Sequence, residues 1–339
     1  MIILNKNFLL FSLLSVCCAG CSRLHQDQRD HDLHGCFDNS TGSDTQVPPA
    51  DALYSAVKGA LLGTRFTSFS ELKSVIQIEY INENKDTDST IHCGAKVCIR
   101  HHSNGKEVIS VLQYGISQGD IADAKDGTFF DRLSIMFRSP YAVRSRKDLE
   151  KVYLLSRVRP LLFGEGDVAF FNLAQTMARH INTPGAAFKT AKDSTEKGYL
   201  NTFNHMTAQA FITSCFSERL ADFVGDTHER YHHPELILGK FSKKEINDLA
   251  EGPVDNYVDI INNEWGQEVG KQLRKEYQLG RNTLWTPQLM ADYLNDLQDY
   301  FSWAFQVGFE PFRPEDEQVW KFTRKMNMVL SAASFEKYY

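Results

Sequence analysis

The chain has 339 residues, with 43 Asp and Glu against 37 Lys and Arg, so its formal net charge is −6 at pH 7. A mildly acidic chain without a basic tract does not suit a phosphate backbone, and we expect no nucleic-acid partner. The length fits one large domain or two smaller ones, and the 12% aromatic content supports a substantial buried core.

Residues 1–20 have the pattern of a secretory signal peptide. One cation, Lys6, is followed by an apolar run from Phe8 to Val16 that is too short to span a membrane, and then by small residues before Cys21. Removal of these 20 residues leaves 319 of the 339, and the loss of Lys6 changes the net charge from −6 to −7.

The end of this segment, Cys18-Ala19-Gly20-Cys21, resembles a bacterial lipobox, although Cys18 stands where Leu is usual. In a lipobox the last Cys carries lipid, such as palmitate, and becomes the first mature residue. Ordinary cleavage and a retained anchor are the alternatives. We therefore expect an exported periplasmic or cell-surface lipoprotein, anchored through Cys21 to a membrane, with the bacterial outer membrane as the favoured location.

Residues 21–50 are polar, rich in Asp and His, and without an apolar period, which predicts a disordered tether. A weak metal site at its histidines is the less favoured interpretation.

Residues 51–125 indicate a small α+β region with a β-hairpin. The segment 50–62 has helical spacing, whereas 74–82 alternates apolar and polar residues as a strand does. Asn104-Gly105 separates two further strand-like runs, and both residues accept the positive φ of a tight hairpin turn. His101 and His102 are expected on an exposed face beside this turn.

Apart from Cys21, four cysteines remain after the leader, and an exported chain meets an oxidising compartment. Cys93 and Cys98 are expected to close a small disulfide loop. A bond between Cys36 and Cys215 is an open alternative. Zinc at the Cys93 pair is less favoured because no second Cys pair follows.

Residues 126–339 read as an α-helical domain, so the fold class is α+β: a mainly α-helical C-terminal domain with a small antiparallel β-containing N-terminal region. Ser242 and Thr286 are candidate N-caps, and Pro287 is a candidate first helical residue. Gly280 is expected just past the end of a helix. Helices are predicted over 146–158, 166–181, 200–224, 242–251, 254–279, 286–306 and 314–333.

Three short clusters of polar residues, which we call polar islands, lie within these mostly apolar helices. In the first, His205 shares a stripe with Gln209 and Ile212 and should point into the protein, either toward a site or as a hydrogen-bonded core residue. In the second, Asp226 and Glu229 accompany His228, a candidate general base or metal ligand. A helix cap at Asp226 is the plain alternative.

The third island lies on the predicted helix over 254–279. Asp259, Asn263, Gly266 and Gly270 fall on one stripe, with Asn262 adjacent. Each glycine costs about 1 kcal/mol relative to Ala in a helix, so we expect a close helix approach there. The buried amides and carboxylates then need partners from the other islands, either in a site or in a network that only fixes packing.

Residues 195–275 resemble a family of bacterial helical domains of unknown function. Its motifs are Asn/Asp-Ala-Phe-Arg-His, Asp-Ala-His-Glu and Met-Asp-Leu-x-Asn-Asn-x-x-Gly. This chain has NTFNH at 201–205, DTHE at 226–229 and VDIINN at 258–263 followed by Gly266. Asn204 and Ala208 depart from the family's Arg and Trp. The resemblance implies that the three islands converge, but it supplies no reaction.

The favoured function is an exported hydrolase of envelope glycan, peptide or lipid. His205 and His228 with Glu229 are the candidate zinc ligands, and the zinc would activate water. Cys215 lies in an apolar run and is expected to be inert. The predicted catalytic set is His205, Asp226, His228, Glu229, Asp259, Asn262 and Asn263.

Two other functions stay open. One is a non-catalytic binding or structural lipoprotein that engages an envelope protein and whose polar cluster fixes helix packing. The other is a toxin-like effector, against which the lipobox argues.

Overall fold

A three-stranded antiparallel sheet with the order β1-β2-β3 is present in the computed structural model, which describes residues 58–81 and 96–331. β1 (Ile76–Ile81) and β3 (Lys106–Leu112) pair with opposite edges of β2 (Lys96–Ser103). In the turn between β2 and β3, Asn104 and Gly105 have φ values of 49° and 75°. The predicted hairpin is therefore confirmed.

Helices make up most of the remaining described chain, and this confirms the predicted α+β class with a mainly helical C-terminal part. Ser242 and Thr286 cap their helices and Pro287 begins one, as predicted. The short helical turns are η1 (Gly63–Arg65), η2 (Ala191–Ser194) and η3 (Glu196–Leu200). The helices are α4 (Phe69–Lys73), α5 (Gln118–Asp126), α6 (Phe129–Arg138), α7 (Pro140–Arg144), α8 (Arg146–Ser156), α9 (Pro160–Phe163), α10 (Phe170–His180), α11 (Pro184–Ala187), α12 (Asn201–Cys215), α13 (Glu218–His232), α14 (Glu235–Leu238), α15 (Lys243–Asn247), α16 (Pro253–Glu276), α17 (Pro287–Phe305) and α18 (Glu317–Leu330).

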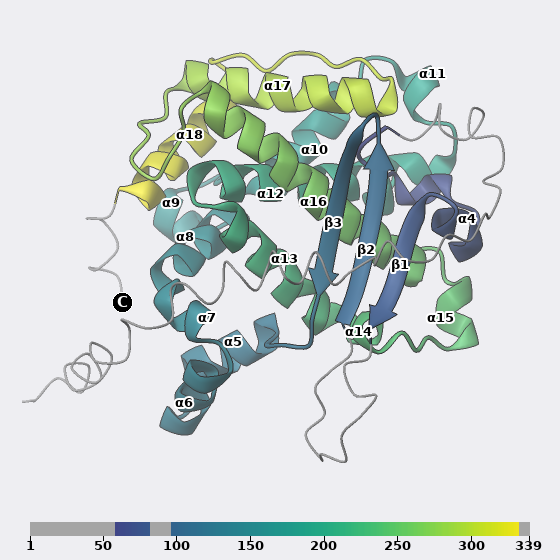
Figure 1. Cartoon of the computed structure of the whole chain (residues 1–339). Helices are drawn as coiled ribbons and strands as arrows, with labels where there is room; N and C mark the ends of the chain where they lie inside the picture. Colours follow the sequence, from purple (N-terminus) through teal and green to yellow (C-terminus); the bar gives the residue numbers. More distant parts are fainter. Residues whose placement is uncertain (1–57, 82–95, 332–339) are drawn as a thin grey trace, which may run out of the picture. The chain divides into compact units, whose positions relative to one another are not determined.

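Helix α16 is the central element of the fold. It is buried along most of its length and packs against α12, α13 and the strands β2 and β3 (Figure 1). A Cβ on Gly266 would lie 2.9 Å from Met206 Cα, and one on Gly270 would lie 2.6 Å from the Ala210 carbonyl oxygen. The close helix approach predicted from the two glycines is thus confirmed, between α12 and α16.

The described residues, 58–81 and 96–331, belong to one compact unit and contain its hydrophobic core as described. Strands β2 and β3 contact α16 directly, so the sheet and the helices share this core.

The single helix predicted over 200–224 is wrong. The helical backbone breaks at Phe216 (φ −119°, ψ −82°), and the Ser217 side chain caps a new helix by accepting a hydrogen bond from the Leu220 N–H. The apolar run continues across the break, so periodicity alone does not reveal it. The second polar island consequently lies inside α13, facing α16 rather than extending α12.

The helix predicted over 50–62 is also wrong for its described part, 58–62. Gly59 has a φ of 64°, and the following residues run extended into the core. Their backbone groups bond to side chains instead: the Ala60 N–H donates to Tyr300 and the Leu61 N–H donates to Asn262. The helix predicted over 254–279 ends three residues earlier, at Glu276, so Gly280 lies past its end but does not cap it.

His101 is buried, with 1% of its surface exposed, so its predicted exposed position is wrong. The Trp265 Nε1–H of α16 donates a hydrogen bond to His101 Nδ1 at 2.9 Å. Burial lowers the pKa of His101 to about 4, which keeps the ring neutral as an acceptor. His102, one residue on, is exposed as predicted.

Cys215 is a free, buried thiol, which rules out the alternative bond to Cys36. Burial raises the pKa of this thiol, in keeping with the expected inert cysteine. Cys98 is disulfide-bonded. The predicted partner Cys93, the leader, Cys21 and the tether lie outside the described residues. Within 58–81 and 96–331, no helix is long and apolar enough to cross a membrane.

Candidate functional site

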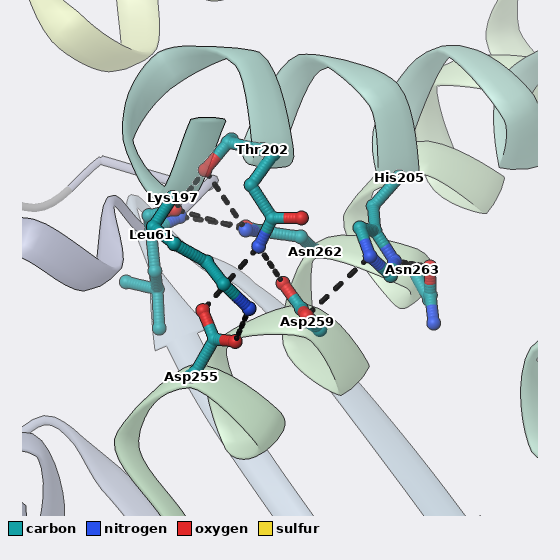
Figure 2. A network of polar contacts seen from close by, with 9 residues as sticks. Leu61, Lys197, Thr202, His205, Asp255, Asp259, Asn262 and Asn263 are labelled. Carbon is teal, nitrogen blue, oxygen red and sulfur yellow. Dashed lines mark hydrogen bonds and ion pairs between the residues drawn. The ribbon is translucent and has the colours of Figure 1, made fainter. Parts of the chain in front are cut away.

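His205 lies between two polar groups of α16. Its Nδ1 is 3.0 Å from Asn263 Oδ1, and its Nε2 is 3.4 Å from Asp259 Oδ2. Figure 2 shows His205 pointing from α12 toward both residues. Asp259 and Asn263 are four residues apart, so one helix face presents both acceptors to one ring. The first and third polar islands therefore meet, as predicted.

The network continues through three residues that sequence reasoning missed. Asn201 donates to Asp259 Oδ1 at 2.8 Å, and Lys197 donates to Asp255 Oδ2 at 2.9 Å. Helical spacing was an available signal for two of them: Asn201 precedes His205 by four residues and Asp255 precedes Asp259 by four. Lys197 lies in η3, just before α12, and had no such signal.

Two carboxylates thus lie one helical turn apart on α16. Burial raises the pKa of Asp259 well above its usual range, and the negative charge of Asp255 adds to this rise. The pKa of Asp255 is raised as well, by burial, even though Lys197 opposes the shift. The pair therefore holds a proton more tightly than isolated carboxylates do.

Glu229 of α13 is the least satisfied group of the site. Only 2% of its surface is exposed, and its Oε1 has no hydrogen-bond partner among the described residues. Burial, and then the charge of Asp259, raises the pKa of Glu229 to about 8. Glu229 is accordingly a protonated carboxylic acid at neutral pH, able to donate a proton.

A small cavity of about 10 Å³ adjoins this acid. Glu229 and Asn263 line it, together with Asp226, Gly225 and Gln267 among others. This volume is about that of one water-sized group. A Cβ on Gly225 would lie 3.1 Å from Gln209 Nε2, so the glycine helps to keep space at this helix crossing.

His228 is adjacent to the first imidazole. Its ring centre is 6.3 Å from that of His205 and 4.5 Å from that of His232. Burial, and then the nearby His205, lowers the pKa of His228 to about 3, so it is neutral at physiological pH. Its Nδ1 is 3.4 Å from Gln118 Oε1 of α5.

Two predicted site residues have other partners. Asp226 pairs with Arg230 at 3.1 Å rather than with His228, although it lines the small cavity. Asn262 points away from His205: its Oδ1 accepts from the Leu61 N–H at 2.8 Å and its Nδ2 donates to the Leu61 carbonyl at 2.9 Å. Asn262 therefore fixes the segment before η1.

No group of three His, Cys, Asp or Glu side chains in the described ranges is arranged to hold a metal ion. The zinc set His205, His228 and Glu229 gains no support from this geometry. A larger cavity of about 250 Å³ lies between the hairpin turn, α16 and α17, and contains none of the predicted site residues.

The chain matches no known protein-family model, no curated protein and no solved structure. The family resemblance of residues 195–275 stays a prediction, and the site must be interpreted from its own chemistry.

Proposed function

We propose that this chain is a hydrolase that uses His205 and Glu229 for acid–base catalysis. The observation that carries this proposal is the buried, unpartnered Glu229 carboxyl beside a water-sized cavity that Asn263, a partner of His205, also lines. Strongly perturbed carboxyl pKa values next to an oriented imidazole are typical of acid–base sites.

The roles follow from the contacts. Asp259 and Asn263 hold the His205 ring, as the orienting groups of a catalytic base do. With Nδ1 donating to Asn263 Oδ1, Nε2 of His205, whose 3.4 Å contact with Asp259 is the longer of the two, accepts a proton from the attacking water as that contact opens. Glu229, with its raised pKa, donates one to the leaving group. His228, neutral beside the His205 ring, positions the reacting groups without competing for the proton.

The substrate class follows from the expected location. As a lipoprotein anchored through Cys21, the chain would meet envelope glycans, peptides and lipids, and we propose that its substrate is among them. Labelled palmitate should enter the wild-type protein and not Cys21→Ser.

The direct test is hydrolysis of isolated envelope material, separated into glycan, peptide and phospholipid fractions, with the products identified by mass spectrometry. We expect Glu229→Gln and His205→Gln to lower the rate by about 100-fold or more. Glu218→Gln, on the exposed start of the same helix α13, should act as the wild type does. Equal product from all four proteins would contradict the proposal.

A non-catalytic binding lipoprotein is the second candidate. The hydrogen bonds of Asn262 with Leu61 and Thr202 favour this second candidate, because those bonds only fix the packing of the chain. If it is correct, the wild type releases no product from any fraction, and His205→Gln lowers thermal stability without changing any rate.

A further inference from the structure

Helix α6 exposes an apolar face to solvent. Phe129, Phe130 and Phe137 are 57%, 76% and 74% exposed, whereas the same helix buries Ile135 in a small cluster with Ile116 and Ala142. Exposed aromatic side chains gathered on one short helix mark an interaction surface more often than isolated apolar residues do.

The spacing shows that this face is continuous. At 100° per residue, Phe130, Leu133 and Phe137 follow one line, and Phe129, Leu133 and Met136 follow its neighbour. Ile135 lies on the opposite side of the helix. The side of α6 that carries Ile135 therefore packs on the protein, whereas the three phenylalanines face outward and Leu133 and Met136 beside them are half-buried.

Helix α6 is nevertheless well formed. Thr128 and Asp131 make a reciprocal capping box at its start, and its main packing contacts are with α5 and α7 (Figure 1). The aromatic side chains thus have a fixed scaffold.

The chain segment from α6 to the start of α8 is basic, in a chain whose net charge is −6. Residues 129–147 contain five Lys or Arg and one acidic residue, Asp131. The preceding helix α5, which packs on α6, is acidic: it adds Asp120, which pairs with Arg138 at 2.8 Å, and Asp123 and Asp126 against Lys125. The exposed basic residues Arg144, Arg146 and Lys147 follow in the chain.

We propose that α6 docks on an anionic lipid surface, with its phenylalanines in the boundary between head groups and acyl chains. A short helix with Phe on one face and Arg on its flanks matches an interfacial membrane helix, because the rings leave water while the cations meet lipid phosphates. A second copy of this chain fits less well, since the basic flanks of the two copies would face each other.

Vesicle binding tests this proposal with the unit of residues 47–339, which holds the whole described core and lacks Cys21. Without residues 1–46, no leader or lipid on Cys21 can hold the protein on the vesicle. The wild-type unit should bind phosphatidylglycerol vesicles more tightly than phosphatidylcholine vesicles, and added salt should weaken the binding.

The variant Phe130→Ser/Phe137→Ser should bind phosphatidylglycerol vesicles at least about ten-fold more weakly, because two rings no longer leave water. Leu284→Ser is the matched control, since Leu284 is also 76% exposed but lies in the loop between α16 and α17. It should bind as the wild type does. Phe130→Leu/Phe137→Leu, which keeps the apolar face, should retain most of the affinity.

Unchanged affinity of the Ser variant, or equal affinity for both lipids, would overturn the proposal. A third result would also overturn it: a wild type that does not bind vesicles but forms dimers, with the dimers lost in the Ser variant. The aromatic face would then bind a second copy of the chain.

Discussion

Two buried clusters of charged groups in this chain differ in how completely their polar atoms are paired. Lys325 of α18 is 1% exposed and donates to Asp167 at 2.8 Å and to the carbonyls of Arg157 and Val168. Asp167 also accepts from the backbone N–H groups of Arg159 and Val168. Every bond that such an ion pair needs for stability is present.

The cluster around Glu229 is the opposite case. Two raised carboxyl pKa values, those of Asp259 and Glu229, occur close together, and one oxygen of Glu229 has no partner among the described residues. Native proteins seldom leave such groups unsatisfied without a reason. A satisfied buried pair indicates a structural role, whereas an unsatisfied acid in a polar cavity indicates a site that contributes chemistry.

Breaking the satisfied cluster should have the largest effect. Lys325→Met leaves the Asp167 carboxylate buried without its cation, and we expect the free energy of unfolding to fall by about 3–5 kcal/mol. Lys321→Met, on the same helix, removes an ion pair with the exposed Glu317 and a 3.3 Å hydrogen bond to the Glu165 carbonyl, and should cost about 1 kcal/mol or less. Chemical denaturation measures both, and equal losses would show that the Lys325 pair has no special role.

Neutralising the unsatisfied cluster should instead stabilise the protein. The pKa of Glu229 is raised from about 4.3 in an unfolded chain to about 8 in the folded state. The folded state therefore retains a proton that the unfolded state loses, and stability falls as pH rises from about 4 to 8. Because Gln does not titrate, Glu229→Gln should not show this fall in stability.

We expect Glu229→Gln to match the wild type near pH 4 and to exceed its stability by a few kcal/mol at pH 8. Melting temperatures measured across this range give the comparison. Parallel pH profiles for the two proteins would show that Glu229 titrates normally.

The close crossing of α12 and α16 at Gly266 and Gly270 brings the unsatisfied cluster together. This crossing should have no room for an added methyl group. Gly270→Ala places a Cβ 2.6 Å from a backbone oxygen of α12, which cannot move aside, and should cost about 1–3 kcal/mol. Gly185→Ala, where no atom lies within 4 Å, should be close to neutral. Equal melting temperatures of the two variants would contradict the close approach.

The smallest effect is expected at Asp226, on the edge of the same cluster. Asp226 pairs with Arg230 four residues on, and Asn still offers an oxygen to Arg230, which also donates to the carbonyls of Gln113 and Ile116. Asp226→Asn should therefore cost about 1 kcal/mol. Hydrolysis should survive this change and be lost in Glu229→Gln. Loss of activity in both variants would restore Asp226 to the catalytic set.

Sequence patterns predicted those features that depend on local spacing. Asn104-Gly105 predicted the hairpin, and the stripe of Asp259, Asn263, Gly266 and Gly270 predicted both the close helix crossing and the meeting with His205. Each of these follows from helix or turn geometry alone.

Features that depend on tertiary partners could not be predicted in this way. The break at Ser217 is hidden by a continuous apolar run, and the burial of His101 requires Trp265, which lies 164 residues away. The direction of Asn262 depends on where Leu61 passes, and the pairing of Lys197 with Asp255 joins η3 to α16. No spacing rule connects such distant residues.

The protonation state of Glu229 tests the central claim most directly. In an infrared difference spectrum of wild type minus Glu229→Gln at pH 7, we expect the C=O band of a protonated carboxyl group that disappears with a midpoint near pH 8. A band that disappears between about pH 4 and 5, as for an ordinary glutamate, would contradict the account.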